Sequence, residues 1–379
     1  MTKTLKLAAF TAMGVVVMAG APQTAQADPY SCSDATYGGS GTYSQAPNCE
    51  ANNTANQSST VATSTTVLRS ASTQTAGMVS GRVSSALSGV SGNVNVAANG
   101  FNASTGIPAG NMGGKMGVWA SGSWSDVEDD NDATAFDGNI TTGLAGVDYE
   151  VRPGVVLGLA AGYEDIDIDT EFNGTDTEDG NIDGEGWTVA PYLGVSFSDR
   201  VKMDLSAGYS DVEYDLVRFD PNTGNRITGS TDGERYFVSA GLSSTYDLQN
   251  NWSVMTRGSA FYAHEEKDAF TETEEGAGTI DQESTDNELG QLLLDTRFAY
   301  DYQMVQPYVL VGLEYDFAKD DTPVAAGQSV SDDDFGAKLG AGINLINVGN
   351  VTAGIEAYTV EFREDYDEFT VNGGLRVKF

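Results

Sequence analysis

The chain has 379 residues, of which 40% are hydrophobic, and its 55 acidic and 19 basic side chains give a formal net charge of -36. A chain this acidic repels nucleic acid, so we expect no nucleic-acid partner and look instead to cations or cationic surfaces. The mean hydropathy of -0.26 excludes a bundle of membrane helices. It still permits a membrane β-barrel, in which only alternate strand residues face lipid.

Residues 1–27 have the layout of a bacterial signal peptide. Two lysines precede an apolar run at residues 7–18, and Ala25-Gln26-Ala27 offers small residues to a signal peptidase. A retained membrane helix is the alternative, but the run is shorter than the ~20 apolar residues that a spanning helix needs. We therefore expect residues 1–27 to be removed on export.

Residues 28–65 have a low-complexity composition that buries too little apolar surface to offset the entropy of ordering, so we interpret them as a tail. Cys32 and Cys49 lie in this tail, and because an exported pair of thiols can oxidise, we expect a disulfide between them. A lipid anchor on Cys32 is the alternative. It is disfavoured because residues 28–31 lack the apolar and small residues of a lipobox.

The pattern changes at residues 66–90, where the spacing of aliphatic residues predicts a slim helix. The alternative is a flexible coil, because Gly77, Gly81 and the many Ser and Thr residues disfavour helix formation. The residues that define the predicted helix are Val67, Leu68, Arg69, Val79, Arg82, Val83 and Leu87.

After a linker at residues 91–113, residues 114–379 show the period-two alternation of β-strands. Short turns follow the even-numbered segments and longer, acidic connections follow the odd-numbered ones, as in bacterial outer-membrane barrels. We therefore predict a twelve-stranded antiparallel up-and-down transmembrane β-barrel. The twelve segments begin near Lys115, Asn139, Val155, Gly186, Val201, Arg235, Asn251, Leu289, Val305, Phe335, Val351 and Phe369. The outer connections are predicted at residues 126–138, 164–185, 211–235, 264–288, 316–334 and 361–368.

Alternation also assigns the charged residues to the two faces of the barrel. A charge on the lipid face costs about 2–4 kcal/mol at the midplane, and the pattern forces none onto it. We expect the lumen charges to neutralise one another and hold the strands in register, in preference to forming a selectivity filter. The predicted lumen charges are Lys115, Asp148, Lys202, Asp204, Arg257, Asp295, Arg297, Glu314, Lys338, Glu356, Arg376 and Lys378.

Two further features have the residue types of functional sites. The segment Asp165-Ile166-Asp167-Ile168-Asp169 is rich in carboxylates but lacks the spacing of a calcium loop, so we expect only diffuse binding of divalent cations to the acidic loops. His264 has no Ser or Cys nucleophile in a recognisable context. We expect no enzyme, cofactor or metal site, with a hydrolase that pairs His264 with a loop acid as the alternative.

Several segments resemble the translocator barrel of the autotransporters, the type V secretion proteins of Gram-negative outer membranes. The resemblance rests on the opening strand Lys115 to Trp124, on Phe136-Asp137-Gly138-Asn139 and Gly143 to Tyr149, on Gly158 to Tyr163, and on the terminal Phe379. It implies a helix that passes through the pore to an N-terminal passenger on the cell surface. It also implies that the barrel-assembly machinery reads the aromatic terminal strand that ends at Phe379.

The chain departs from this family in its passenger, because residues 28–65 are far too short for the passengers usual in the family. Asn52-Asn53 resembles the asparagine pair that is cleaved inside some family barrels, but it lies upstream of the predicted helix, so ordinary linker asparagines are the favoured interpretation. We expect a monomeric integral protein of the cell outer membrane that displays a short N-terminal segment and acidic loops, with an adhesive or structural role. A small-solute channel is the alternative.

Overall fold

In the computed structural model, all described residues lie within one compact unit, Glu50–Phe379. The described residues are 54–88, 116–130, 135–170, 180–220, 223–320, 333–348, 351–363 and 366–378. The predicted signal peptide, the Cys32 and Cys49 pair, the linker, Lys115 and Phe379 lie outside them, as do the side chains of Arg376 and Lys378.

The helix α1 spans Thr54–Ser88. It begins earlier than the aliphatic pattern predicts, so residues 54–65 are helical and not part of an extended tail. The physical reason is cooperative growth, because each residue added to an existing helix gains a hydrogen bond without a new nucleation cost. Among the described residues, no helix has the apolar length that crossing a membrane requires.

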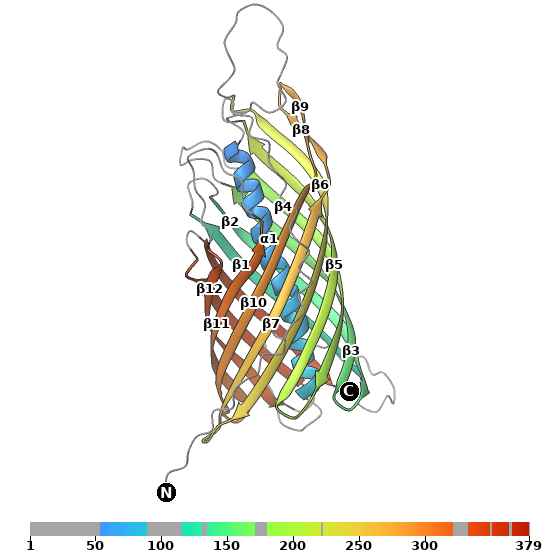
Figure 1. Cartoon of the computed structure of the whole chain (residues 1–379), viewed down its shortest axis with the longest axis vertical. Coiled ribbons are helices and arrows are strands. Elements are labelled where there is room, and N and C mark those ends of the chain that lie inside the picture. Colours follow the sequence, from blue (N-terminus) through green and yellow to red (C-terminus); the bar gives the residue numbers. More distant parts are fainter. Residues whose placement is uncertain are drawn as a thin grey trace, which may run out of the picture. The chain divides into compact units, whose positions relative to one another are not determined.

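Twelve strands close into an antiparallel barrel, which confirms the predicted fold. Neighbours in the chain pair with each other, β7 pairs with β10 across an inserted hairpin, and β1 pairs with β14 to complete the cylinder. Figure 1 shows α1 running along the inside of this cylinder. The barrel strands are β1 (Met116–Asp129), β2 (Phe136–Arg152), β3 (Val155–Thr170), β4 (Gly180–Ser196), β5 (Val201–Phe219), β6 (Arg226–Asp247), β7 (Trp252–Lys267), β10 (Thr285–Tyr300), β11 (Val305–Lys319), β12 (Phe335–Val348), β13 (Val351–Glu361) and β14 (Tyr366–Lys378). The inserted hairpin consists of β8 (Phe270–Glu274) and β9 (Gly278–Gln282).

The two ends of the barrel differ in the length of their connections. At one end, here called the short-turn end, only a few residues separate β2 from β3, β4 from β5, β6 from β7 and β10 from β11. Residues with positive φ make several of these turns possible, among them Gly154 at 78° and Gln303 at 56°. The opposite end, the long-loop end, carries the longer connections.

The strands are longer at the long-loop end than the sequence predicts. Much of the predicted outer connections at residues 164–185 and 211–235 is paired strand, because β3, β4, β5 and β6 continue beyond the expected limits. The inward residues of these extensions, Ile166, Ile168 and Val212, are buried. Burial of these apolar side chains stabilises the paired strands where they continue beyond the predicted membrane-spanning segments.

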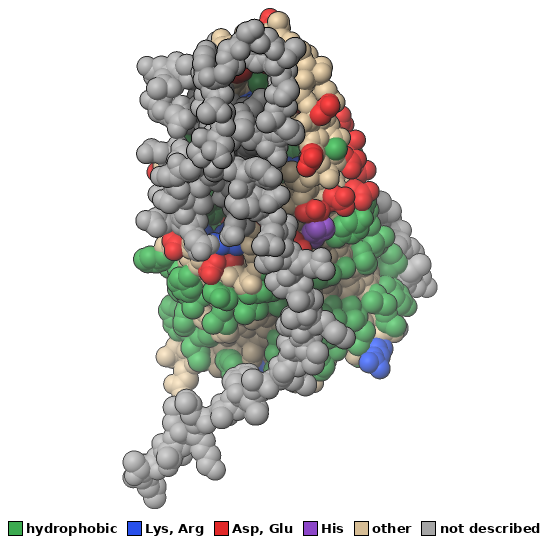
Figure 2. All heavy atoms as spheres, turned by 45° about the horizontal axis from the view of Figure 1, so that its top comes forward, with side chains coloured by type: hydrophobic (Ala, Val, Ile, Leu, Met, Phe, Trp, Pro, Cys, Tyr) green, Lys and Arg blue, Asp and Glu red, His purple; other side chains and the backbone are tan. Residues whose placement is uncertain are grey.

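The outer face of the barrel is apolar around its middle. Figure 2 shows a belt of hydrophobic side chains with acidic side chains beyond it. Trp252 and Tyr300 pair at strand ends (ring centroids 5.1 Å apart), and Tyr163 and Trp187 pair within β3 and β4, where the acidic strand extensions begin (5.1 Å). Amphipathic rings in these positions are typical of residues at the boundary between lipid and water.

Candidate functional site: the helix-filled lumen

The barrel buries most of the described side chains of α1 between Thr66 and Leu87. Val67, Leu68, Val79, Val83 and Leu87, which the aliphatic pattern singles out, are each at most 2% exposed. Because the helix is made mostly of small residues, it fits a lumen that would exclude bulkier side chains. Full burial of each Val or Leu contributes about 1.5–3 kcal/mol to the packing of helix against wall.

Two apolar clusters line the path of the helix. Toward the long-loop end, Val67 and Ala71 pack with Ile140, Ile166 and Tyr214 of the wall. The second cluster joins Leu68, Ala76, Met78, Val79, Val83, Ala86 and Leu87 to Trp119, Leu144, Val156, Ala160, Ala190, Tyr192, Phe237, Phe261, Ala263 and Leu289. The helix therefore has an apolar binding surface along most of its buried length.

The helix packs mainly against one arc of the wall, formed by β1–β7 and β10. The remaining arc, β11–β14, presents buried charged side chains to the lumen, among them Glu314, Lys338, Glu356 and Glu368. The buried wall residues that cluster with α1 all lie on the first arc, although this arc also carries buried charges such as Asp148, Asp204 and Arg257. We call β11–β14 the polar arc.

Two wall glycines allow the helix to approach the strands closely. A Cβ atom added at Gly194 would collide with Cγ1 of Val83 and lie 3.2 Å from Cδ1 of Leu87. A Cβ atom at Gly117 would collide with the guanidinium of Arg82. A larger residue at Gly194 would press on Val83 and Leu87 of α1, and one at Gly117 would displace the Arg82 guanidinium or the Asp148 carboxylate.

Arg82 ties α1 to the barrel close to the short-turn end. Its Nε donates a hydrogen bond to Oδ2 of Asp148 on β2, and both side chains are almost fully excluded from solvent. The Tyr192 hydroxyl also donates to Asp148 at 3.3 Å and accepts a hydrogen bond from Trp119 Nε1 at 2.8 Å. The helix cation and the wall anion are therefore held in one buried polar cluster.

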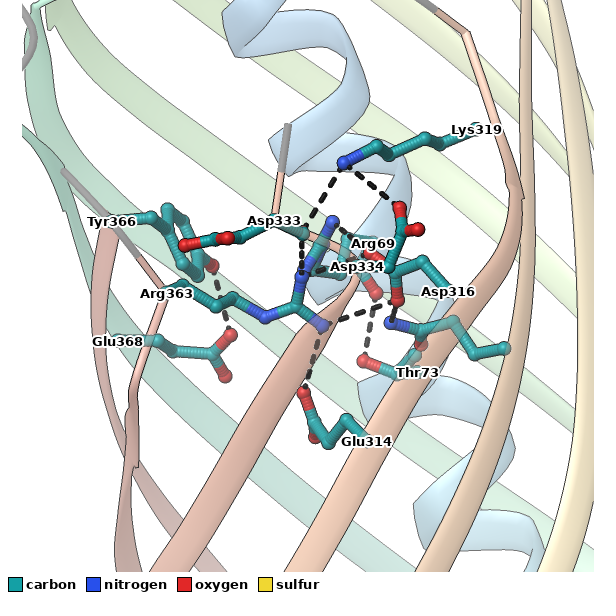
Figure 3. Close-up of polar contacts among 11 residues, drawn as sticks. Arg69, Thr73, Glu314, Asp316, Lys319, Asp333, Asp334, Arg363, Tyr366 and Glu368 are labelled. Carbon is teal, nitrogen blue, oxygen red and sulfur yellow. Dashed lines mark hydrogen bonds and ion pairs between the residues drawn. The ribbon is translucent and has the colours of Figure 1, made fainter. Parts of the chain in front are cut away.

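Arg69 ties α1 to the polar arc close to the long-loop end. Its Nη2 lies 2.7 Å from Oδ2 of Asp316, and Nη1 of Arg363 lies 2.9 Å from the same oxygen. Arg363 also approaches Glu314 at 3.5 Å, and Glu314 pairs with Lys338 at 3.0 Å. Figure 3 shows that Asp316 lies between an arginine of the helix and an arginine of the wall.

The structure places the other predicted lumen charges inside the barrel wherever it describes them. Arg257 pairs with Asp204 at 2.7 Å, and Arg297 pairs with Glu356 at 2.6 Å. Lys202 and Asp295 are also buried. Strand β6 lies between Asp204 and Arg257, and strands β11 and β12 lie between Arg297 and Glu356. Each ion pair therefore joins strands that are not direct neighbours in the wall.

A second charged cluster, which the alternation pattern did not predict, lies at the long-loop end. Arg235 lies 2.7 Å from Glu164 and 3.0 Å from Glu265, and the Tyr214 hydroxyl donates to Glu265 at 2.6 Å. Together with Asp316 and Arg363, these residues fall in the segments predicted as outer connections. Alternation could have predicted this cluster, because Glu164 is two residues before Ile166 and therefore lies on the same inward face of β3.

The remaining candidates lie on the outward face. His264 is 32% exposed and its ring nitrogens lie 3.7 Å from Asp286 and 3.9 Å from Glu288. Asp167 faces Asp183 across β3 and β4, and Asp183 faces Asp215 across β4 and β5. Among the described residues, no group of three or more His, Cys, Asp or Glu side chains is arranged to hold a metal ion.

The helix-filled barrel agrees with a family model. The model of the autotransporter β-domain matches residues 118–357. The chain belongs to this family. Its fold and family are those of outer-membrane proteins of Gram-negative bacteria.

Solved autotransporter barrels have the same fold at low sequence identity. The translocator domain of NalP from Neisseria meningitidis has a TM-score of 0.59 and 13% identity, over 71% of this chain and 90% of that one. The β-domain of BrkA from Bordetella has a TM-score of 0.55 and 15% identity, over 70% of this chain and 100% of that one. The transport unit of AIDA-I from Escherichia coli has a TM-score of 0.51 and 10% identity, over 72% of this chain and 93% of that one. A search of curated proteins found no match.

Proposed function

We propose that this autotransporter barrel anchors itself in the outer membrane and uses α1 to hold a short N-terminal segment at the cell surface. The observation that carries the proposal is the direction of the helix. Arg69 lies close to the long-loop end and Arg82 lies close to the short-turn end. In bacterial barrels the long loops face the medium, so the N-terminal end of α1 is directed toward the medium.

An epitope tag inserted at Ser40 tests this direction of display. On intact cells, added protease removes a tag at Ser40 if the segment is displayed, while a matched tag in the short turn at Asp199 stays protected until the outer membrane is opened. Equal protection of both tags would overturn the proposal.

We assign the displayed segment and the acidic outer surface an adhesive or structural role. Asp165 faces Glu185 and Asp167 faces Asp183 on adjacent strands, and like charges in opposite positions repel each other. Divalent cations that collect on this surface relieve the repulsion. The other partners in this proposal are the lipid of the outer membrane and the barrel-assembly machinery, which reads the strand ending at Phe379. The protein is taken to act as a monomer.

A small-solute channel is the second candidate, and the off-centre helix favours it. Between α1 and strands β6, β7 and β10–β13 lies a cavity of about 30 Å³, lined by Thr73, Gly77, Arg257, Asp295 and Lys338 among others. This volume accommodates about two water molecules. Planar-bilayer recordings of the purified protein separate the two functions, because a large steady current supports the channel and a closed barrel supports display.

A further inference from the structure

The β8–β9 hairpin extends the sheet beyond the barrel at the long-loop end. Its strands pair from Phe270 with Gln282 to Glu274 with Gly278. It joins the barrel through β6, where Ile227 pairs with Glu274 and Thr228 pairs with Thr273. Figure 1 shows the hairpin beside the upper end of β6.

A buried ion pair fixes the hairpin in this position. Arg218 of β5 donates to Glu272 of β8 through Nε at 2.9 Å and Nη2 at 2.5 Å, and both side chains are at most 9% exposed. Gln282 donates to the same carboxylate at 2.6 Å, and Asn225 donates to Glu274 at 2.9 Å. An isolated two-stranded hairpin is marginally stable in water, so these contacts keep it ordered.

The strand β9 is the outer edge of the sheet. In the described part of the chain, each of the twelve barrel strands has neighbours on both sides, whereas β9 pairs with β8 alone. Alternate residues of an antiparallel edge strand direct their N–H and C=O groups away from the partner. Such an edge is a template for one additional strand.

The side chains around this edge define the chemistry of the strand that it accepts. Thr279 and Asp281 are exposed on one face, Ile280 and Gln282 are half-buried on the other, and Glu275 and Glu283 are exposed beside them. A second copy would set this acidic edge against its own acids, which disfavours self-pairing. Residues 28–53 of this chain contain three acidic residues and no Lys or Arg, so they lack the complementary charge as well.

We propose that β9 binds an extended basic segment of another protein as an added strand, with Lys or Arg opposite Asp281 and a β-branched residue over Ile280. Main-chain hydrogen bonds to the free edge provide the pairing, and the acids select the partner. The inference concerns the hairpin alone and holds whether or not the N-terminal segment is displayed.

The test uses the purified full-length protein in detergent micelles and a fluorescent Lys-Val-Lys-Val-Lys-Val peptide, with binding followed by fluorescence anisotropy. The control peptide has the same side chains but N-methyl groups on alternate residues, which block strand pairing and keep the charge. We expect the plain peptide to bind and the methylated peptide to bind about tenfold more weakly, or worse, because two or more main-chain hydrogen bonds are lost.

Two matched variants separate the edge from the general acidity of the surface. Asp281→Lys reverses one charge on β9, and Asp167→Lys makes the same change on the outward face of β3. We expect Asp281→Lys to weaken binding of the plain peptide about fivefold or more, and Asp167→Lys to have a much smaller effect. Equal binding of both peptides, equal losses in both variants or no binding of the plain peptide would overturn the proposal.

Discussion

Arg82 of α1 and Asp148 of β2 form an ion pair whose side chains are 0% and 5% exposed. The second helix arginine, Arg69, is placed differently, because its partner Asp316 is shared with Arg363 of the wall. In the described contacts, no second cation can take the place of Arg82 beside Asp148. Arg363 can take the place of Arg69 beside Asp316. The first two predictions follow from this difference.

Arg82→Ala leaves the Asp148 carboxylate buried with the Tyr192 hydroxyl, at 3.3 Å, as its remaining described donor. Removing one partner of a buried pair costs about 3–5 kcal/mol, so we expect the free energy of unfolding to fall by that amount. Urea unfolding in micelles, followed by tryptophan fluorescence, measures the change. Adding Asp148→Ala to the variant should restore part of the loss, and a double variant no more stable than the single one would contradict this account.

Arg69→Ala has a smaller predicted effect. Asp316 keeps hydrogen bonds from Arg363 at 2.9 Å and from Gln291 at 2.8 Å, so its charge stays compensated. We expect a loss of about 1–2 kcal/mol in the free energy of unfolding, measured in the same urea experiment. A loss as large as that of Arg82→Ala would show that Arg363 does not replace the helix arginine.

Gly194→Leu places a large side chain where Val83 and Leu87 of the helix lie. We expect the overpacking to cost about 1–3 kcal/mol and to displace α1, so the purified protein passes more current in planar bilayers. Gly143→Leu is the matched control, because nothing lies within 4 Å of a Cβ atom built at Gly143. Equal currents from the two variants would exclude displacement of the helix.

Asp183 lies in the strand extension beyond Trp187, and its pKa is raised by burial and then by the nearby carboxylates, with Asp167 foremost. A folded-state pKa above the unfolded value means that the ionised group costs stability at neutral pH, and that this cost disappears as the pH falls through the raised pKa. We expect Asp183→Asn to raise the thermal midpoint at neutral pH and to have little effect in acid.

The same repulsion predicts a response to calcium. Calcium ions should raise the thermal midpoint of the natural protein at neutral pH, and should raise that of Asp183→Asn by less. A variant less stable than the natural protein at neutral pH would show that the Asp183 carboxylate is stabilising, contrary to its surroundings.

The sequence alone was sufficient for the barrel, because lipid on one side and a polar lumen on the other impose period-two alternation on every strand. Tyr149 and Asp148 exemplify this alternation, with one exposed outward and the other buried inward. The ends of the strands were predicted wrongly, because the outward residues of the strand extensions are acidic. Asp165 and Asp167 look like loop residues until Ile166 and Ile168 are recognised as the buried face of the same strand.

The contacts of the lumen could not be predicted from alternation. Which wall acid meets Arg69 or Arg82 depends on how deep α1 lies and on which arc it packs against, and both follow from packing between segments distant in the chain. The β8–β9 hairpin was missed for another reason. Its strands have five residues each and lie in an acidic segment that resembles a solvated loop.

The position of Asp316 between two arginines bears on the order in which the molecule assembles. Strands β11 to β14 can join with Asp316 already neutralised by Arg363, so closure of the cylinder does not have to wait for α1. Among the described residues, the arginine that pairs with Asp148 belongs to the helix. Entry of α1 is then the step that neutralises Asp148, and a late folding phase sensitive to Arg82 but not to Arg363 would be its kinetic signature.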